Sequence, residues 1–340
     1  MAHRPFIGIT MGDPSGIGPE IIMKALCDPD ICLLCRPVVL GDRLILESAM
    51  PDRVRADVVE IAHPHEVQGP PGVVHVIPTS FLDTASITIG KGVPLGGKAM
   101  MEAINRAVDM AMEGELDAMV TCPINKALMH EAGFPYEGHT QYIAERTQTE
   151  HTVMMLAGGN FRIALATIHC ALKEVPSRLA VPGIYRTITT TSRALQLDFA
   201  LSEPRIAVAA LNPHGGEERL FGSEEETLIR PAVEMARSEG YRVDGPFPAD
   251  TLFQKVLDGQ FDAVVAMYHD QGLIPLKLLH FSNAVNVTLG LPIIRTSVDH
   301  GTAYDIAGKG IADPSSLKAA IRMAVILSTN RKMRHGQQRY

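Results

Sequence analysis

The sequence has no surplus of positive charge and no long apolar run, and each absence excludes a class of protein. Its 340 residues include 31 lysines and arginines against 38 aspartates and glutamates, which gives a formal net charge of −7 at pH 7. Binding to nucleic acid or to an anionic membrane surface through charge requires the opposite balance. No segment approaches the roughly 20 apolar residues that span a bilayer. The sequence therefore predicts neither a nucleic-acid-binding protein nor a membrane protein.

Cysteine is also scarce, with five residues in the chain. An odd number of cysteines in a long chain indicates a reducing compartment rather than a disulfide framework. The chain passes from Met1 into a strand-like run without the apolar segment and cleavage site of a secretory signal. We therefore expect a cytoplasmic protein. Cys32 and Cys35 form a lone Cys-x-x-Cys pair, to which the sequence assigns no role because a second pair or a thioredoxin-like context is missing.

The order of the apolar patterns predicts an α/β fold, and the length favours two domains. Short apolar runs that read as buried strands alternate with segments of helical spacing, such as residues 98–113, as far as about residue 280. This alternation is typical of βαβ units and of a largely parallel sheet. No repeat, low-complexity tract or long linker divides the chain, so we expect the two domains to be interwoven in sequence.

Three histidines each follow a short apolar run: residues 162–168 precede His169, residues 205–213 precede His214, and residues 261–268 precede His269. Parallel strands that are buried on both faces read as such runs, and ligands of open α/β sheets bind at the carboxyl ends of the strands. Three imidazoles at one edge could converge on a metal, with the nearby Asp250 or Asp270 orienting them. Three unrelated loop histidines are the alternative. The histidines alone do not separate a hydrolase from a dehydrogenase.

Two further features follow strand-like runs in the first half of the chain. Gly12, Gly16 and Gly18 could let the backbone approach a ligand, although their spacing is neither a dinucleotide fingerprint nor a P-loop. A tight strand-to-helix turn is the equal alternative. Thr140 is a predicted N-cap for a helix that runs from Gln141, and the start of that helix would face an anion. A plain capped helix is the alternative there.

Polar residues also interrupt the apolar runs near the C-terminus. Lys277, Asn286 and Arg295 follow the third histidine, and a cation or an amide is costly to bury without a partner. They either pair with carboxylates or bind an anionic substrate. Arginine and lysine together suit a phosphate, arginine through its planar fork and lysine as a point charge.

Six motifs resemble those of the 4-hydroxythreonine-4-phosphate dehydrogenase family, in order and over nearly the whole chain. They are Gly12-Asp-Pro-Ser-Gly-Ile-Gly-Pro-Glu20, Gly138-His-Thr140, Leu211-Asn-Pro-His-Gly215, Pro248-Ala-Asp-Thr-Leu-Phe253, Met267-Tyr-His-Asp-Gln-Gly272 and Arg295-Thr-Ser-Val-Asp-His-Gly-Thr-Ala303. The motifs are long, so the resemblance is specific. It implies a cytoplasmic homodimer whose active site forms at the subunit interface. It also implies that NAD and a divalent metal oxidise a secondary alcohol beta to a carboxylate, after which carbon dioxide is lost.

The resemblance implies a three-layer αβα fold with two domains, of the isopropylmalate dehydrogenase type. Residues 1–125 plus 280–340 would form the cofactor-binding domain, and residues 126–279 the substrate, metal and dimerisation domain. The implied metal is zinc, with cobalt, manganese or magnesium as alternatives, and both subunits would contribute to each site. The implied metal ligands are His169, His214 and His269, and the implied substrate-binding residues are His139, Thr140, Lys277, Asn286 and Arg295.

Residues 300–313 resemble the adenosine-binding loop of isopropylmalate and isocitrate dehydrogenases. The likeness implies that His300, Gly301, Asp305 and Asp313 bind the cofactor. A carboxylate at Asp305 would bind the ribose hydroxyls and repel a 2′-phosphate, which favours NAD over NADP. Those enzymes carry an adenine-contacting asparagine where this chain has Asp313, so the sequence departs from their pattern at that position.

The candidate general base is Lys126, which follows the strand-like run 118–121 as a catalytic lysine does in the decarboxylating dehydrogenases. The predicted substrate is 4-hydroxythreonine 4-phosphate, with 4-phospho-D-threonate and 4-phospho-D-erythronate as alternatives. Asn286 and Arg295 together argue against an aromatic dihydrodiol, which needs no phosphate site. A phosphate acetyltransferase of the same general fold, which needs no three-histidine metal site, is the alternative from another class of enzyme.

Overall fold

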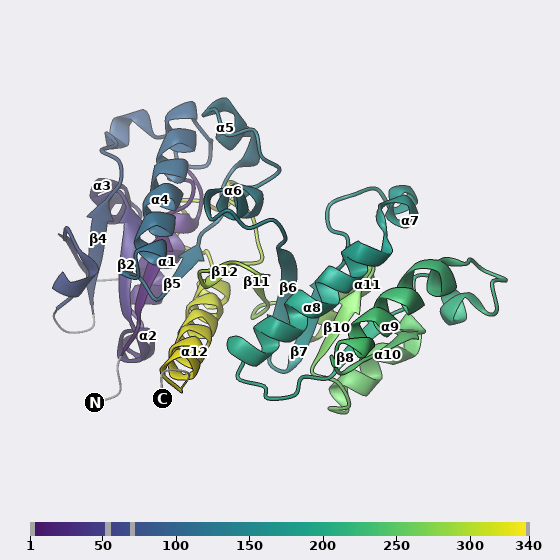
Figure 1. Cartoon of the computed structure of the whole chain (residues 1–340). Coiled ribbons are helices and arrows are strands. Elements are labelled where there is room, and N and C mark those ends of the chain that lie inside the picture. The colour runs from purple at the N-terminus through teal and green to yellow at the C-terminus, as the bar shows by residue number, and fades with distance from the viewer. Residues whose placement is uncertain (1–3, 52–55, 69–71, 338–340) are drawn as a thin grey trace. The chain divides into compact units, whose positions relative to one another are not determined.

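A computed structural model describes residues 4–51, 56–68 and 72–337, and the chain divides into two compact units. The first unit contains the chain up to residue 150 together with residues 291–329, and the second contains residues 151–290 together with the stretch from residue 330. Figure 1 shows the elements of the two units, coloured by their position along the chain. Both units are built from strands with flanking helices, so the predicted α/β class is confirmed.

The sheet of the first unit is wholly parallel. Its strands lie in the order β3-β4-β2-β1-β5-β12. Residues of β1, β2 and β5 are almost completely buried, as expected for central strands covered on both faces. The strands are β1 Phe6–Thr10, β2 Arg36–Gly41, β3 Asp57–Glu60, β4 Val73–Pro78, β5 Ala118–Thr121 and β12 Arg295–Ser297.

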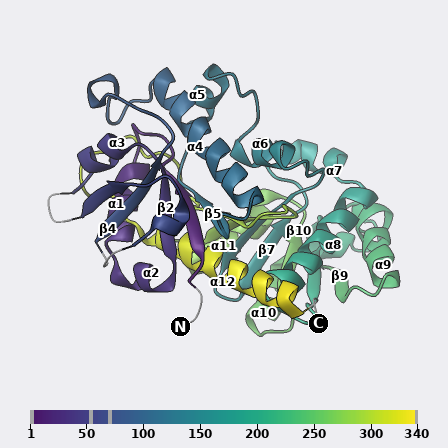
Figure 2. The same ribbon diagram turned by 60° about the vertical axis from the view of Figure 1, so that its left-hand side comes forward.

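Helices lie on both faces of this sheet. On one face, α4 contributes Met101 and Ile104 to an apolar core that also contains Leu40 of β2 and Met119 of β5. On the other face, the Thr296 hydroxyl donates to the backbone carbonyl of Ala320 in α12. Figure 2 shows α12 beside the strands. The helices are α1 Gly18–Leu26, α2 Pro29–Leu34, α3 Arg43–Ser48, α4 Pro94–Met112, α5 Lys126–Glu131, α6 His139–Arg146 and α12 Ser315–Gln337, with 3-10 turns at Pro64–Glu66 and Thr84–Ser86.

The second unit has a mixed sheet in the order β11-β6-β7-β10-β8-β9. Strand β6 runs antiparallel to both of its neighbours, and the strands from β7 to β9 are parallel. Helices α10 and α11 share an apolar core with the sheet, and α8 contacts β6, β7 and β11. The strands are β6 Val153–Gly158, β7 Phe161–Leu165, β8 Ile206–Ala209, β9 Val243–Phe247, β10 Ala263–Ala266 and β11 Val285–Leu289.

The second unit also contains two irregular segments. These segments are a 3-10 turn at Pro213–Gly216 and a π-helical turn at Glu225–Ile229. The C-terminal end of α12 also belongs to this unit, where Arg331 forms an ion pair of 2.7 Å with the buried Asp198. The helices are α7 Val175–Arg178, α8 Val181–Leu197, α9 Arg230–Ser238, α10 Ala249–Leu257 and α11 His269–His280, with a further 3-10 turn at Leu172–Glu174.

The unit boundaries differ from the expected domain boundaries after residues 125 and 279. They fall after residues 150 and 290 because α5 and α6 pack in the core of the first unit, through Met129 and Ile143. Strand β11 pairs with β6 and therefore belongs to the second unit. The assignment of cofactor and substrate roles to the two domains stays a prediction.

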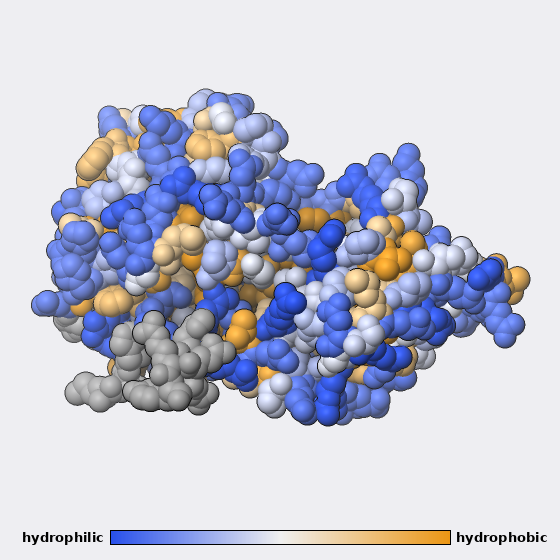
Figure 3. All heavy atoms as spheres, viewed as in Figure 1, coloured by the Kyte–Doolittle hydropathy of each residue, from blue (hydrophilic) through white to orange (hydrophobic). Residues whose placement is uncertain are grey.

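The described residues contain no helix that is both long and apolar enough to cross a membrane. The face of the molecule drawn in Figure 3 carries mainly hydrophilic residues, with scattered apolar ones. Exposed apolar residues of this scattered kind are normal for folded proteins.

Candidate active site

The three glycines after β1 make close contacts within the chain. A Cβ atom on Gly12 would lie 2.4 Å from the Pro123 carbonyl oxygen, and one on Gly16 would lie 2.9 Å from the Thr302 carbonyl oxygen. Gly12 also has a φ of +74°, which favours glycine. The glycines therefore form a tight strand-to-helix turn against the chain's own backbone, as in the structural alternative for this motif.

Arg295 is the centre of a polar cluster in the first unit. It is 1% exposed and begins the short, buried strand β12. Its Nη2 atom donates to the Thr121 hydroxyl at 2.7 Å and to Nε2 of His139, and Nη1 donates to the Thr140 hydroxyl at 3.2 Å. Strands β12 and β5 pair in parallel, with Ser297 opposite Thr121 and Arg295 opposite Met119. Arg295 therefore lies two positions along the pair from Thr121, and its long side chain reaches the Thr121 hydroxyl. The structure thus joins three of the predicted substrate-binding residues.

The electrostatics of this cluster keep His139 neutral. Burial, the Arg295 guanidinium and the Lys126 ammonium hold the pKa of His139 well below its usual value of 6.5. Because Nε2 accepts from Arg295, the proton of the neutral ring lies on Nδ1. Burial lowers the pKa of Arg295 to about 9. The cluster therefore contains one desolvated positive charge beside hydroxyls and a neutral imidazole.

The cluster lies at the start of α6, where the sequence prediction was wrong in one detail. The helix begins at His139 with Gly138 as its N-cap, so Thr140 is its second residue and not the N-cap. Gly138 takes an extended φ of 174°. A Cβ atom there would lie 3.5 Å from Cε of Lys126, so the lysine stem passes close to this turn. The Thr140 side chain is available to Arg295 because it does not cap the helix.

A second, partly buried network in the first unit was not predicted. The Tyr304 hydroxyl donates to a carboxylate oxygen of Asp13 and accepts from Nδ2 of Asn125 at 2.9 Å. The other oxygen of Asp13 accepts from the Ser15 backbone N–H at 2.9 Å. Burial raises the pKa of Asp13, against the lowering effect of these hydrogen bonds. The sequence offers one signal, the carboxylate of Asp13 in the glycine-rich turn, but no local pattern indicates that Tyr304 is its partner.

The predicted cofactor-binding residues lie in a mostly exposed loop of the first unit. His300, Gly301 and Asp305 are exposed. Asp313 is also exposed, but one of its oxygens accepts from both the backbone N–H and the hydroxyl of Ser315, which hold its pKa below the usual value. Asp313 therefore starts α12 as a charged acceptor, and a charged acceptor offers no donor to an adenine ring nitrogen.

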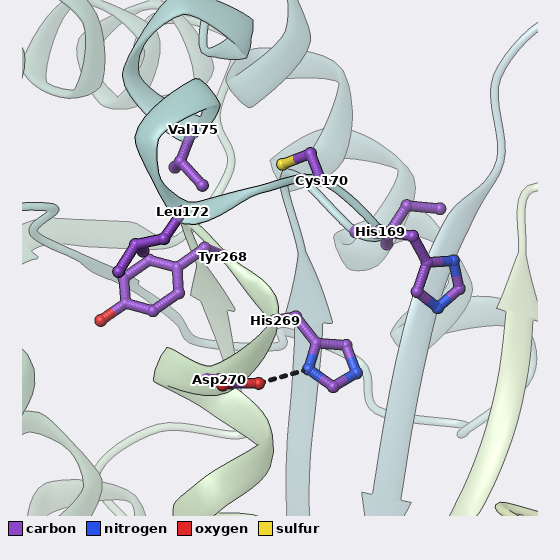
Figure 4. Close-up of a pocket in the computed structure, with 8 residues that line it drawn as sticks. His169, Cys170, Leu172, Val175, Tyr268, His269 and Asp270 are labelled. Carbon is purple, nitrogen blue, oxygen red and sulfur yellow. Dashed lines mark hydrogen bonds and ion pairs between the residues drawn. The ribbon is translucent and has the colours of Figure 1, made fainter.

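The three histidine-terminated runs form neighbouring strands in the second unit. Strands β7, β10 and β8 are adjacent and parallel, so their carboxyl ends meet at one edge as predicted. At this edge the rings of His169 and His269 have centroids 6.1 Å apart. They line a pocket of about 440 Å³ whose wall includes Tyr268 and Leu172. Figure 4 shows both imidazoles and the hydrogen bond of 2.7 Å from Nδ1 of His269 to Asp270.

The third histidine of the predicted metal site, His214, lies on a separate turn. Among the described residues, no three histidine, cysteine or acidic side chains are arranged to hold a metal ion. His214 is exposed in the 3-10 turn after β8, where its ring lies 6.3 Å from that of Phe221. The prediction of a three-histidine site, to which both subunits contribute, is therefore untested by one chain.

The other two predicted substrate-binding residues also lie in the second unit. Lys277 is half-buried on α11, and Asn286 is half-buried on β11, where its register partner is Leu156. The side-chain oxygen of Asn286 is buried and has no hydrogen-bond partner among the described residues. Such an oxygen is costly to leave without a donor, which makes Asn286 the more informative of the two.

The chain is thus a two-unit α/β protein, with a buried polar cluster around Arg295 in one unit and an imidazole pair at the ends of adjacent strands in the other. The chain belongs to the family described as pyridoxal phosphate biosynthetic protein PdxA, whose model matches residues 33–324. It is 55% identical over 328 residues to a protein of Desulforapulum autotrophicum named 4-hydroxythreonine-4-phosphate dehydrogenase, with 96% of each chain covered. The predicted family resemblance is confirmed.

The chain is also similar to other proteins, two of which carry different names. A protein of Cupriavidus necator named D-threonate 4-phosphate dehydrogenase is 44% identical, covering 97% of this chain and 99% of the relative. The crystal structure of a 4-hydroxythreonine-4-phosphate dehydrogenase from Klebsiella pneumoniae superimposes with a TM-score of 0.88 at 41% identity, covering 95% of this chain and 99% of that one. A terephthalate 1,2-cis-dihydrodiol dehydrogenase from Burkholderia xenovorans has a TM-score of 0.66 at 28% identity, with 95% and 98% covered. These names support an oxidoreductase.

Proposed function

We propose that this protein is an NAD- and divalent-metal-dependent dehydrogenase of the cytoplasm. It oxidises the 3-hydroxyl of 4-hydroxythreonine 4-phosphate, and carbon dioxide is then lost. The observation that carries the proposal is the buried Arg295 beside Thr121, His139 and Thr140. The name of the Desulforapulum relative supports the choice of substrate.

The Arg295 cluster has the chemistry of a phosphate site. A guanidinium that is 1% exposed is costly to bury, and a phosphate beside it offsets that cost. The Thr140 hydroxyl and the first N–H groups of α6 add neutral donors for phosphate oxygens. We assign Lys277 and Asn286 to substrate binding as well, because a lysine suits a phosphate and the Asn286 amide carries a donor and an acceptor.

The imidazole pair of the second unit fits part of a divalent metal site. His169 and His269 offer nitrogen donors that zinc and cobalt favour, and Asp270 orients His269. When bound, such an ion supplies Lewis-acid polarisation of a hydroxyl or carbonyl oxygen. We propose His214 of a second copy as the third ligand, because no third ligand is in place within the described part of one chain. The active form is then a homodimer. Zinc is the first candidate, with cobalt, manganese or magnesium as alternatives.

For the nicotinamide cofactor, the exposed loop around Asp305 is the proposed binding segment. A carboxylate at that position suits two vicinal ribose hydroxyls and disfavours a 2′-phosphate, so we propose NAD. His300 and Gly301 belong to the same segment. Asp313, with its oxygen held by Ser315, is the weakest member of the predicted set.

Lys126 is the proposed acceptor of the hydroxyl proton. It begins α5 beside the Gly138 turn. A Lys126→Met variant should lose about two to four orders of magnitude in kcat, as expected for removal of a general base. The matched control is Lys98→Met, at an exposed lysine on α4. Near-normal turnover of Lys126→Met would remove Lys126 from this role.

A second substrate is favoured by the Cupriavidus relative named D-threonate 4-phosphate dehydrogenase. Its name describes a phosphorylated hydroxy acid, to which the Arg295 cluster is equally suited. The amino group at C2 distinguishes the two substrates, and none of the contacts around Arg295 addresses that group.

The deciding experiment follows NADH absorbance with the full chain and three substrates side by side. These are 4-hydroxythreonine 4-phosphate, 4-phospho-D-threonate and 4-phospho-D-erythronate, each with and without prior metal chelation. The proposal expects the highest kcat/KM for the first substrate, and loss of turnover on chelation that zinc or cobalt restores. Absence of NADH with all three would refute the dehydrogenase assignment. A preference for 4-phospho-D-threonate would select the second substrate.

A further inference from the structure

The loop that carries His214 has a backbone conformation that needs support from the surrounding structure. Six consecutive residues have a positive φ, and four of them are not glycine. Side chains other than glycine seldom adopt this conformation, which persists only where the surrounding structure enforces it. The φ angles are 54° at His214, 70° at Gly215, 83° at Gly216, 41° at Glu217, 53° at Glu218 and 76° at Arg219.

The carboxylate of Glu225 provides the main hold on this loop. Glu225 is 2% exposed, and no cation pairs with it among the described residues. One oxygen accepts from the backbone N–H groups of Leu211 at 2.8 Å and Asn212 at 2.7 Å. The other accepts from Nδ2 of Asn212 at 3.0 Å, and the same nitrogen also donates to Glu224 at 2.8 Å. A buried carboxylate with three donors from a single segment fixes that segment immediately before His214.

The far side of the loop closes on the same carboxylate. A Cβ atom on Gly216 would lie 2.7 Å from Oε2 of Glu225, so the backbone after His214 passes directly over the carboxylate. The Phe221 N–H donates to the Gly216 carbonyl at 3.2 Å, and the Phe221 ring faces that of His214. His214 therefore lies between the segment that donates to Glu225 and a glycine whose backbone passes close to the same carboxylate.

Glu225 is itself placed by an irregular helix. It begins the π-helical turn Glu225–Ile229, which leads directly into α9. A π-helical turn holds one more residue than an α-helical turn, and such turns are frequent at functional sites. Ile229, at its end, is completely buried. The turn is thus anchored in the core at one end and directs the Glu225 carboxylate into the loop at the other.

We propose that Glu225 is a positioning residue that presents the imidazole of His214 for metal binding. The inference rests on the proposed function, in which His214 is a metal ligand. In this role Glu225 is not itself a metal ligand. It acts through the backbone of residues 211–216, and its loss lets the His214 turn relax from its left-handed conformation.

The test is direct binding of Co²⁺ to the full chain, followed by visible absorption without substrate. The variants are Glu225→Gln, Asn212→Ala and His214→Ala, and the matched control is Glu234→Gln at an exposed position on α9. In Glu225→Gln, an amide NH₂ replaces one carboxylate oxygen and faces Nδ2 of Asn212. Both groups are donors, so the hydrogen bond between them is lost. We expect Co²⁺ affinity to fall about tenfold to a hundredfold, within the range for residues that orient metal ligands. Asn212→Ala, a milder change, should give a smaller loss, and Glu234→Gln none.

A second measurement needs no metal. Trypsin cleavage after Arg219 in the metal-free protein should be faster in Glu225→Gln than in the wild type or in Glu234→Gln. If Glu225→Gln does not fold, Asn212→Ala decides the question by the same two measurements. Lower thermal stability with unchanged Co²⁺ affinity would overturn the inference, because Glu225 would then be structural only. If His214→Ala binds Co²⁺ as tightly as the wild type, the proposed ligand set fails, and this inference fails with it.

Discussion

Arg295 of β12 donates a hydrogen bond of 2.7 Å to the hydroxyl of Thr121 at the end of β5, with both residues buried. The contact joins residues that are 174 positions apart. It is possible because β12 returns the chain to the sheet beside β5. The guanidinium is therefore held on a rigid strand, and its second nitrogen reaches Thr140 on α6.

The first prediction concerns the shape of this cation. Arg295→Lys keeps the charge but loses the planar fork that reaches Thr121, Thr140 and His139 at once. We expect KM for the phosphorylated substrate to rise roughly tenfold to a hundredfold, in line with the 1.5–3 kcal/mol of a hydrogen bond to a charged group. Steady-state kinetics measure this effect. Arg322→Lys, at an exposed position on α12, is the control, and equal KM values for the two variants would contradict a phosphate role for Arg295.

The second prediction concerns pH. The pKa of His139 is held well below 6.5 in the folded protein, so the unfolded state binds more protons than the folded state once the pH falls below about 6.5. His139 therefore costs stability as the pH falls through this range, and costs none above it. Its contribution to the change in unfolding free energy is at most about 1.4 kcal/mol per pH unit.

Thermal or urea unfolding between pH 7.5 and 5 measures this slope. His139→Gln removes the titrating ring and retains a group that can accept from Arg295. We expect the variant to lose less stability than the wild type over that range. Parallel stability profiles for the two proteins would show that His139 is not held neutral by the fold.

The elements that could be predicted are those whose apolar pattern is local and unbroken. Strand β5 has the predicted limits, because it is a short apolar run bounded by polar or turn residues. The antiparallel strand β6 was not predicted, although its hairpin with β7 turns through Gly159 and Asn160, a typical turn sequence. Its apolar residues resemble those of the parallel strands, and only the two-residue turn distinguishes it.

The candidate site also has parts that could be predicted from the sequence and parts that could not. The edge at which His169 and His269 meet could be predicted, because it follows from the order of strands and loops. The hydrogen bond between Asp13 and Tyr304 spans 291 residues, and no local pattern contains it. The start of α6 was misjudged because Thr140 is a strong N-cap type by propensity, whereas its hydroxyl accepts from Arg295 in the fold.

The third prediction tests the Asp13 network. Tyr304→Phe removes the hydroxyl that donates to Asp13 and accepts from Asn125. Leaving a buried carboxylate without this donor should destabilise the protein by about 1–3 kcal/mol. The same substitution at Tyr185, whose hydroxyl donates to Glu239 on the surface at 2.6 Å, should cost much less stability because water can replace that hydrogen bond. Urea unfolding compares the two variants.

The pH dependence of that loss has a definite sign. The Tyr304 hydrogen bond lowers the pKa of Asp13 against the effect of burial, so its removal should raise this pKa further. A carboxyl group with a raised pKa in the folded state loses stability as the pH rises through that pKa. The difference in unfolding free energy between Tyr304→Phe and the wild type should therefore be larger at pH 8 than at pH 5. A difference that shrinks with rising pH would contradict the role given to this hydrogen bond.

The fourth prediction concerns the carboxylate behind His269. Nδ1 of His269 and Oδ1 of Asp270 are 2.7 Å apart, which leaves Nε2 as the nitrogen for a metal. Asp270→Asn keeps a hydrogen-bond acceptor but removes the charge that favours this orientation. Asp270 is largely exposed, so we expect metal affinity to fall by about tenfold, the lower end of the usual range for such partners. His269→Ala should lose more.

Isothermal titration with zinc measures these affinities, and Asp258→Asn is the control. Asp258 is an exposed carboxylate at the end of α10 that accepts from Gln254 at 2.9 Å, so its substitution makes the same change of charge in the same unit. Equal zinc affinity for Asp270→Asn and Asp258→Asn would mean that Asp270 does not orient His269. Unchanged affinity in His269→Ala would go further, because it would exclude the imidazole pair itself from the metal site.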